Sequence, residues 1–524
     1  MYRIFKLNII LFIFFYQNVF TQEWIRYYGL GPSVSGHYIT EYYDKGYIVL
    51  GIRDYQHGWI IKTDINGYQL WDIKIGNGAY DCNLNNVELT MDSGLIISGS
   101  ITKYDQPYDD PFIIKINSCG FLEWCKVLHF PDNDDYGQSV KCTPDGGYIL
   151  LTFNYTGNPS EKIHLFKFNS TGDLIWQKNY TRDSLVFAEY VRKLFVDNAN
   201  FLITGFCYYP NPGQPGGWIR PYYIQTDTSG NENWQLIYSR NTGFGYVGEA
   251  WVSVRDPHNN YYSSGRREGS PEFIKFSNSG NELYTQDLFP GAEGGNATTI
   301  ICFDDSTYIL YASWTYDGYT NYMGFIKSDT LGNIQEIKYL PNPDESSVWW
   351  TAKTSDNKIL GVGTNVIGSN TRIVAFKVNS ELEYDSIYTN PFTYDSLCPD
   401  SITSKTIDPD CDFVVNVEEP FSNPETVCLK VFPNPAKDEV TVEFPKYLKK
   451  TSGSSGLHIT TVYHQWKSAI LKVYNLSGSV VYSSEIPGSM QQTKIDVSSW
   501  PRGMYYFRLV YDQQTIAGEK AIVN

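Results

Sequence analysis

The segment at residues 59–71, WIIKTDINGYQLW, decides the fold because it recurs along the chain. Residues 112–124 read FIIKINSCGFLEW, and residues 164–176 read HLFKFNSTGDLIW. Each copy has two apolar residues, a Lys, an Asp or Asn, a Gly and finally a Trp. Weaker copies occupy residues 223–234, 273–284, 325–336 and 375–384. The Lys or Gln of the pattern recurs every 50 to 58 residues, at Lys62, Lys115, Lys167, Gln225, Lys275, Lys327 and Lys377.

The residues upstream of each copy complete a four-stranded unit. An Asp–x–Gly turn and an apolar run precede the segment, as at residues 44–51, 92–99 and 145–152, and a further strand-like run precedes that turn. Each repeat therefore predicts four antiparallel strands joined by tight turns. A four-stranded repeat of this length is typical of a β-propeller blade, whereas solenoid units are shorter or helical. The sequence predicts an all-β, seven-bladed β-propeller over residues 22–389.

Two features of the repeat have a structural interpretation. A Trp at a fixed place in each repeat is expected to pack between neighbouring sheets, since a sugar-stacking site is rarely copied into every blade. Asp or Asn followed by Gly supplies a tight turn. The repeat resembles the sialidase Asp-box and the repeat of quinone-dependent alcohol dehydrogenases, but its intervals match neither, so no residues carry over. Residues 24–28, WIRYY, repeat the Trp strand alone and are expected to pair into the last blade.

The first residues have the pattern of a secretion signal. Arg3 and Lys6 precede an apolar run over residues 7–20, which is too short to span a bilayer. Residues 1–21 are predicted to be a signal peptide, and no membrane insertion is expected after its removal. The net charge of −16 disfavours nucleic acid and anionic membrane surfaces as partners.

Residues 390–428 are rich in Pro, Asp and Ser and predict a linker. The chain holds nine Cys, an odd number that leaves at least one thiol without an intramolecular partner. Because secretion permits disulfides, Cys398 and Cys411 in this stretch are predicted to pair.

A different composition begins at residue 429. Short alternating runs with Asn and Gly turns predict a small β-sandwich over residues 429–524. Three blocks, FPNPAKD at 432–438, VYNLSG at 473–478 and GMYYFRL at 503–509, occur in order. They resemble the type A sorting domain of the type IX secretion system, with residues 446–466 as an apparent insertion. The motif residues are Pro433, Asn434, Pro435, Gly478, Gly503, Tyr505 and Arg508.

This resemblance implies a route and two partners. The family uses the domain for export across the outer membrane of a Gram-negative cell. The expected partners are the translocon and a sortase that removes the tail, and the cargo ends on the cell surface or in the medium.

Catalytic motifs are not found. The seven His form no HExxH, and there is no GxSxG elbow or P-loop. No cofactor is predicted, although the acidic loops 105–110 (DQPYDD) and 132–135 (DNDD) leave calcium as an open alternative.

Aromatic loops are the stronger functional lead, because Tyr and Trp on a rigid scaffold stack on sugars or peptides. Residues 206–223 are the longest insertion between strands, and residues 311–322 are another aromatic loop. An alternative is that these rings only cover a face of the propeller. The candidate ligand-binding residues are Tyr208, Tyr209, Trp218, Tyr222, Trp314, Tyr316 and Tyr319.

Two functions remain in view. The first is a secreted or cell-surface, non-catalytic module that binds glycan or protein. The second is a polysaccharide hydrolase or lyase on a propeller scaffold, which convergent carboxylates would support. The missing catalytic motifs favour the first.

Overall fold

The fold is described from a computed structural model. It describes residues 23–103, 108–128, 134–155, 163–180, 189–197, 199–211, 214–238, 248–318, 322–339, 346–414, 429–444, 448–452, 460–464, 468–475, 479–487, 490–511 and 514–524. The predicted signal peptide lies outside these ranges. Strands and turns account for the regular structure of the described residues, and no helix long and apolar enough to cross a membrane occurs among them.

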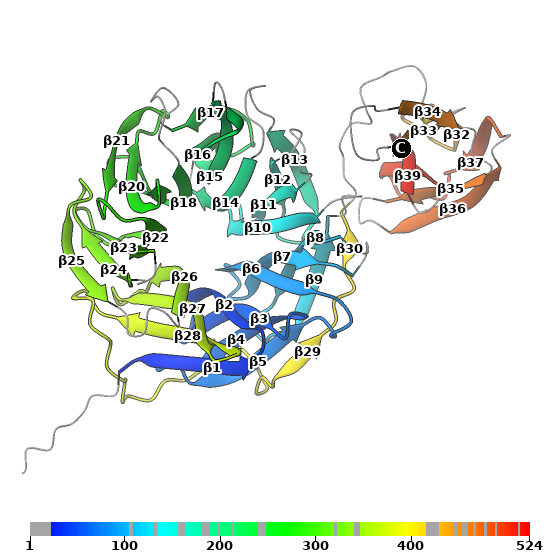
Figure 1. The fold of residues 1–524 in the computed structure, drawn as a ribbon. Coiled ribbons are helices and arrows are strands. Elements are labelled where there is room, and N and C mark those ends of the chain that lie inside the picture. The colour runs from blue at the N-terminus through cyan, green and yellow to red at the C-terminus, as the bar shows by residue number, and fades with distance from the viewer. Residues whose placement is uncertain are drawn as a thin grey trace, which may run out of the picture. The chain divides into compact units, whose positions relative to one another are not determined.

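The chain divides into two compact units. The first, residues 1–74 with 245–406, holds the sheets of blades 1, 5, 6 and 7, seen in blue and in green to yellow in Figure 1. Its strands are, in blade 1, β2 (Val34–Glu41), β3 (Tyr47–Arg53), β4 (His57–Thr63) and β5 (Gln69–Ile75); in blade 5, β18 (Gly248–Arg255), β19 (Tyr261–Arg267), β20 (Ser270–Phe276) and β21 (Glu282–Asp287); in blade 6, β22 (Gly294–Cys302), β23 (Tyr308–Thr315), β24 (Tyr322–Ser328) and β25 (Ile334–Tyr339); and in blade 7, β26 (Ser346–Lys353), β27 (Ile359–Ile367), β28 (Asn370–Val378) and β1 (Ile25–Gly31).

The second unit, residues 75–244 with 407–524, holds blades 2, 3 and 4 and the C-terminal domain. The blade strands are, in blade 2, β6 (Cys82–Leu89), β7 (Leu95–Ile101), β8 (Asp110–Ile116) and β9 (Leu122–Val127); in blade 3, β10 (Asp134–Cys142), β11 (Tyr148–Tyr155), β12 (Ile163–Phe168) and β13 (Leu174–Tyr180); and in blade 4, β14 (Glu189–Val196), β15 (Asn200–Asn211), β16 (Gln214–Asp227) and β17 (Glu232–Ile237). Seven antiparallel blade sheets confirm the predicted propeller fold.

The last blade takes its fourth strand from the beginning of the propeller. β1 pairs with β28, with Ile25 opposite Phe376 and Tyr28 opposite Ile373. The sequence prediction for residues 24–28 is therefore confirmed. The physical reason is that residues 379–384 form a turn and a single bridge rather than a full strand, which leaves the edge of β28 open to β1.

The recurrent turn between the third and fourth strands has the predicted chemistry. The Asp64 carboxylate accepts hydrogen bonds from the backbone N–H groups of Asn66 and Tyr68, and Gly67 at φ 75° reverses the chain. In blade 7 the Gly position is taken by Leu382, which adopts φ 57°. The side-chain cap at Asn379 therefore maintains this conformation in a residue type that rarely adopts it.

In blade 1, the Lys of the repeat forms a buried ion pair with the Asp of the preceding hairpin turn. Lys62 Nζ lies 2.6 Å from Asp44 Oδ1, with both side chains almost fully buried. A Cβ on Gly46 would overlap Lys62 Nζ, so the Asp–x–Gly turn leaves room for the ammonium group. We call this pair the Lys–Asp clamp. It recurs at Lys115–Asp92, Lys167–Asp145 and Lys377–Asp356.

In blades 2 and 3, the recurrent Trp ring packs on the turn of the next blade, as the packing interpretation predicts. A Cβ on Gly172 of blade 3 would lie 2.7 Å from the Trp124 ring of blade 2. Gly230 of blade 4 is equally close to Trp176 of blade 3. The Gly at these turns therefore provides both a positive φ and space for a neighbouring ring.

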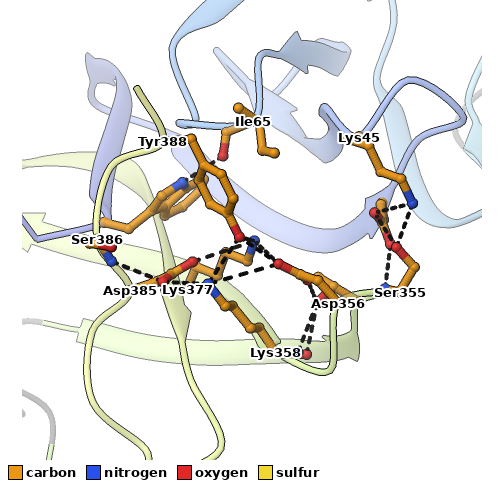
Figure 2. Close-up of polar contacts among 12 residues, drawn as sticks. Lys45, Ile65, Ser355, Asp356, Lys358, Lys377, Asp385, Ser386 and Tyr388 are labelled. Atoms are coloured by element: carbon orange, nitrogen blue, oxygen red, sulfur yellow. Dashed lines mark hydrogen bonds and ion pairs between the residues drawn. The ribbon is translucent and has the colours of Figure 1, made fainter. Parts of the chain in front are cut away.

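Residues 386–414, predicted in large part as a linker, instead lie against the blades. Tyr388 of this strap donates a hydrogen bond to Asp356 Oδ2 at 2.5 Å and accepts one from Lys358 Nζ at 2.9 Å, within the clamp of blade 7 (Figure 2). In blade 1, the Tyr394 hydroxyl accepts the Ile65 N–H, and Asp395 accepts the Trp71 indole N–H at 3.0 Å. The polar composition of the strap reflects contacts with buried ionic groups. Residues 415–428 lie outside the described ranges.

The strap ends on blades 1 and 2. β29 (Lys405–Ile407) extends the blade 1 sheet, and β30 (Asp412–Phe413) pairs in parallel with β9. Cys411 forms a disulfide with Cys125 of β9, so the predicted Cys398–Cys411 pair is wrong. Cys398 is also disulfide-bonded. The pairing follows from β30, which places Cys411 beside β9, a neighbour 286 residues away that the spacing of Cys cannot reveal.

The C-terminal domain is the predicted small β-sandwich. One sheet holds β31 (Lys430–Phe432), β32 (Glu439–Glu443) and β37 (Gln492–Asp496); the other holds β36 (Val480–Pro487), β35 (Ser468–Tyr474), β38 (Gly503–Tyr511) and β39 (Gln514–Val523). Apolar side chains of both sheets, among them Val440, Leu471 and Phe507, form its core. The apparent insertion forms a separate hairpin of β33 (Leu448–Ser452) and β34 (Thr460–His464).

Candidate functional site

An aromatic group at one end of blade 6 is the candidate ligand-binding site. β23 ends here and β24 begins, with Trp314 opposite Tyr322, and β25 ends here with Tyr339 opposite Gly324. The loop after β23 adds Tyr316. We call Tyr316, Tyr322 and Tyr339 the tyrosine cluster. Strand register thus brings together rings that are up to 23 positions apart in sequence.

A buried pair of rings supports this cluster. Phe289 and Trp314 stack with ring centroids 3.8 Å apart and planes 10° apart, and both side chains are buried in the core between blades 5 and 6. Trp314 lies 6.0 Å from the Tyr322 ring and 5.8 Å from the Tyr339 ring. Interior side chains of this kind are close-packed, and Tyr322 and Tyr339 lie against this base.

The tyrosines of the cluster remain open to solvent. Tyr316 is 48% exposed, Tyr322 38% and Tyr339 55%. Their ring centroids are 6.4 Å apart for Tyr316 and Tyr322, and 6.5 Å apart for Tyr322 and Tyr339. Exposed aromatic groups of this kind on a folded surface are typical of binding sites.

Two acidic residues border the cluster. Asp317 follows Tyr316 and accepts a hydrogen bond from Thr315 Oγ1 at 3.1 Å. Glu293 lies across the loop, since a Cβ on Gly318 would be 3.9 Å from Glu293 Oε2. The site therefore combines aromatic faces with carboxylate acceptors, which suits ligands that carry both C–H faces and hydroxyl groups.

The structure separates the predicted aromatic residues into two classes. Tyr222 and Trp314 are wrong as direct ligand contacts, because both are buried: Tyr222 donates its hydroxyl proton to Gln235 Oε1 at 2.8 Å, and Trp314 forms the base of the cluster. Tyr316 is exposed as a contact residue must be, and Tyr208 is half-buried near Tyr190 and Phe206. The side chains of Tyr209, Trp218 and Tyr319 lie outside the described set.

Sequence reasoning did not single out Tyr322, Tyr339 or Phe289. Tyr322 lies at the end of the predicted aromatic loop, but Tyr339 closes a strand whose neighbours give no functional signal. The only available signal is the register of β24 with β25. That register depends on the fold.

A second feature is a bulge at the same place in each first strand of a blade. In the first unit the shifts fall at His37, between Ala250 and Ser253, at Thr298 and at Trp349. Bulges redirect side chains, and Trp349 is 47% exposed. His37 Nε2 lies 2.9 Å from Ser35 Oγ. The bulges of β2 and β26 thus place the His37 imidazole and the Trp349 indole on the first strands of blades 1 and 7.

No described group of three or more His, Cys, Asp or Glu side chains has the arrangement of a metal centre. The acidic loops that left calcium open reach the described residues at Asp109, Asp110, Asp134 and Asp135.

The predicted sorting motif is a structural element of the C-terminal domain. Asn434 Nδ2 donates to the Lys520 carbonyl at 2.8 Å, and Asn434 Oδ1 accepts the Ile522 N–H at 2.9 Å. The Asn434 side chain, between Pro433 and Pro435, thereby holds β39, the last strand.

The second motif lies on β38. The Tyr505 hydroxyl donates to the Pro501 carbonyl at 2.6 Å. The Arg508 guanidinium lies over the Tyr474 ring, 5.9 Å from its centroid. Gly503 begins this strand, and Gly478 lies outside the described residues.

Residues 430–524 match the family described as "Secretion system C-terminal sorting domain". This match confirms the sorting-domain prediction for the tail. Export to the cell surface or the extracellular space follows, and so does interaction with the type IX secretion system. None of the curated proteins matches the chain.

The chain is similar in backbone structure to solved proteins, three of which follow. An ulvan lyase bound to its saccharide shares 10% identity over 66% of this chain and 91% of that chain, with a TM-score of 0.48. An α-L-arabinofuranosidase of Fusarium graminearum shares 12% identity over 57% and 93%, with a TM-score of 0.42. An α-L-arabinanase of Penicillium chrysogenum shares 14% identity over 56% and 93%, with a TM-score of 0.37.

Proposed function

We propose that this exported propeller is a non-catalytic module that binds neutral polysaccharide outside the cell through the tyrosine cluster of blade 6. The observation that carries the proposal is the set of exposed rings Tyr316, Tyr322 and Tyr339 on the stacked base of Phe289 and Trp314. The sorting domain supports an extracellular ligand, because it directs export.

Aromatic rings and carboxylates together define the ligand class. The apolar face of a pyranose stacks on a tyrosine ring, and the cost in side-chain entropy is small because the rings are already packed. Sugar hydroxyls can donate to Glu293 and Asp317 beside the cluster. A sulfated or uronic acid polymer would meet these carboxylates with like charge. Neutral sugars therefore fit best.

The test is binding of the full chain to an array of neutral, uronic acid and sulfated glycans, with soluble products analysed by mass spectrometry. We expect retention on neutral glycans. Tyr316→Ala and Tyr339→Ala should each weaken binding about 5- to 10-fold, the effect of roughly 1 kcal/mol of lost stacking. Tyr55→Ala, which removes a ring 66% exposed on blade 1, is the matched control and should bind normally.

Other outcomes would contradict the proposal. Release of saccharide fragments would show a hydrolase or lyase. Retention on charged glycans alone, or equal loss of binding in Tyr55→Ala and Tyr316→Ala, would remove the role of the cluster.

A further inference from the structure

The junction of blades 2 and 3 buries a carboxylate for which the described residues supply no counter-charge. Asp135, the second residue of β10, is fully buried, and neither carboxylate oxygen has a hydrogen-bond partner among the described residues. An ionised carboxylate in such a place is costly unless it is paired, protonated or bound to a cation.

Other acidic groups surround Asp135. The Asp134 Oδ1 atom accepts the Asp109 N–H at 3.1 Å, and the Asp135 N–H donates to the Asp109 carbonyl at 2.8 Å. Burial first, and then the charges of Asp110 and Asp134, raise the pKa of Asp135 to about 9. Burial and neighbouring carboxylates likewise raise the pKa of Asp109 to about 6.

The backbone explains why these groups meet. A Cβ on Gly137 of β10 would lie 2.5 Å from the Gly99 carbonyl oxygen of β7, so β10 approaches the blade 2 sheet closely. Asp135 shares the side of β10 on which Gly137 lies, because alternate residues of a strand face the same way. Asp135 therefore lies next to the end of the β7–β8 pair, where Ile101 is opposite Asp110.

Several of the unsatisfied buried atoms at this junction are oxygens, and Asn86 Nδ2 is an unsatisfied nitrogen beside them. Besides both oxygens of Asp135, the oxygens are Asp109 Oδ1 and the hydroxyls of Ser98, Ser100 and Thr152, all without a partner among the described residues. Buried polar atoms that lack protein partners usually contact a water or an ion. Oxygen atoms from carboxylates and hydroxyls are the ligands of hard cations, and calcium takes six to eight of them at flexible geometry.

We propose that this junction binds a calcium ion, held by the carboxylates of Asp135 and Asp109 and completed by hydroxyl, carbonyl and water oxygens. No three carboxylates converge on one point in the described residues. The ligand side chains therefore move towards the ion when it binds. The affinity expected is that of extracellular modules, with Kd on the order of 10⁻⁴–10⁻³ M. The ion would neutralise the junction and join the two blades.

The test measures the thermal unfolding midpoint of the full chain after chelation, with calcium or magnesium added to about 5 mM. We expect calcium to raise the midpoint with half-saturation at roughly 0.1–1 mM and magnesium to have a weaker effect. Asp135→Asn should lose the calcium response, while its calcium-free midpoint equals or exceeds that of the unsubstituted protein, because a buried charge is removed. Asp305→Asn, at an exposed turn of blade 6, is the control and should respond normally.

The results also distinguish calcium from a bound proton. If Asp135 is simply protonated, calcium leaves the midpoint unchanged and the proposal is overturned. A full calcium response in Asp135→Asn would overturn it as well. If Asp135→Asn does not fold, Asp109→Asn gives the same test, because Asp109 supplies the second carboxylate.

Discussion

Replacing Lys62 with Met tests whether the Lys–Asp clamp holds a blade together. Lys62 Nζ lies 2.6 Å from Asp44 Oδ1, and the two side chains are 0% and 2% exposed. Lys62→Met leaves the Asp44 carboxylate buried, with the N–H groups of Gly46 and Asp395 as its remaining donors. Removing one partner of a buried ion pair costs about 3–5 kcal/mol, so we expect a loss of that size in the free energy of unfolding.

Two further variants make the interpretation specific. Lys45→Met removes a neighbouring ammonium that is 48% exposed and lies 3.3 Å from Glu41, and should cost only about 0–1 kcal/mol. The double variant Lys62→Met with Asp44→Asn removes both charges and should recover most of the loss, because the uncompensated carboxylate is then absent.

The assay is equilibrium unfolding in urea followed by Trp fluorescence, which reports on Trp24 and Trp59 in the core of blades 1 and 7. The reasoning is refuted if Lys62→Met and Lys45→Met have equal effects. It is also refuted if the double variant is no more stable than Lys62→Met.

Three other predictions follow from the clamps, the strap and the sorting domain. Burial opposes ionisation of Asp356, but hydrogen bonds from Thr354 and Tyr388 and the charge of Lys377 outweigh it and hold the pKa of Asp356 at about 2; stability should therefore fall as pH drops from about 4 towards 2, and an acid titration of Asp356→Asn should show a weaker fall. Cys411→Ser should free β30 from β9 and speed tryptic cleavage after Lys405, whereas Cys302→Ser, which removes a free thiol, should leave the cleavage rate unchanged. Asn434→Ala removes both side-chain hydrogen bonds to β39. It should lower the free energy of unfolding of the sorting domain by about 1–3 kcal/mol. Unchanged export in cells would show that the secretion machinery does not recognise this strand.

Sequence periodicity was sufficient to predict the blades. Turn chemistry is local: Asp64 caps its own backbone within four residues, and Gly67 supplies the positive φ beside it. The position of Trp within the repeat likewise predicted that Trp124 would pack between sheets. The motif blocks of the tail identified the sorting domain for the same reason, since each block is a contiguous run.

Burial was the part of the candidate site that could not be predicted. Trp314 and Tyr316 are two residues apart, yet one is 3% and the other 48% exposed. The difference arises because Phe289, from the preceding blade, covers Trp314. Composition marked this loop as aromatic, but the neighbouring blade determines which of its rings are exposed.

The sequence by itself determined the number of blades, their turns and the route of export, because these depend on short-range patterns that repeat or stand together. The tertiary structure alone decided that Cys411 pairs with Cys125, that Tyr388 completes a clamp, and that Asp135 lies buried with no counter-charge among the described residues. The disulfide and the Tyr388 hydrogen bond join the strap to a blade, and Asp135 lies where blade 3 packs against blade 2. The physical reason is that such contacts depend on how sheets and strap pack, and sequence spacing carries no record of that packing.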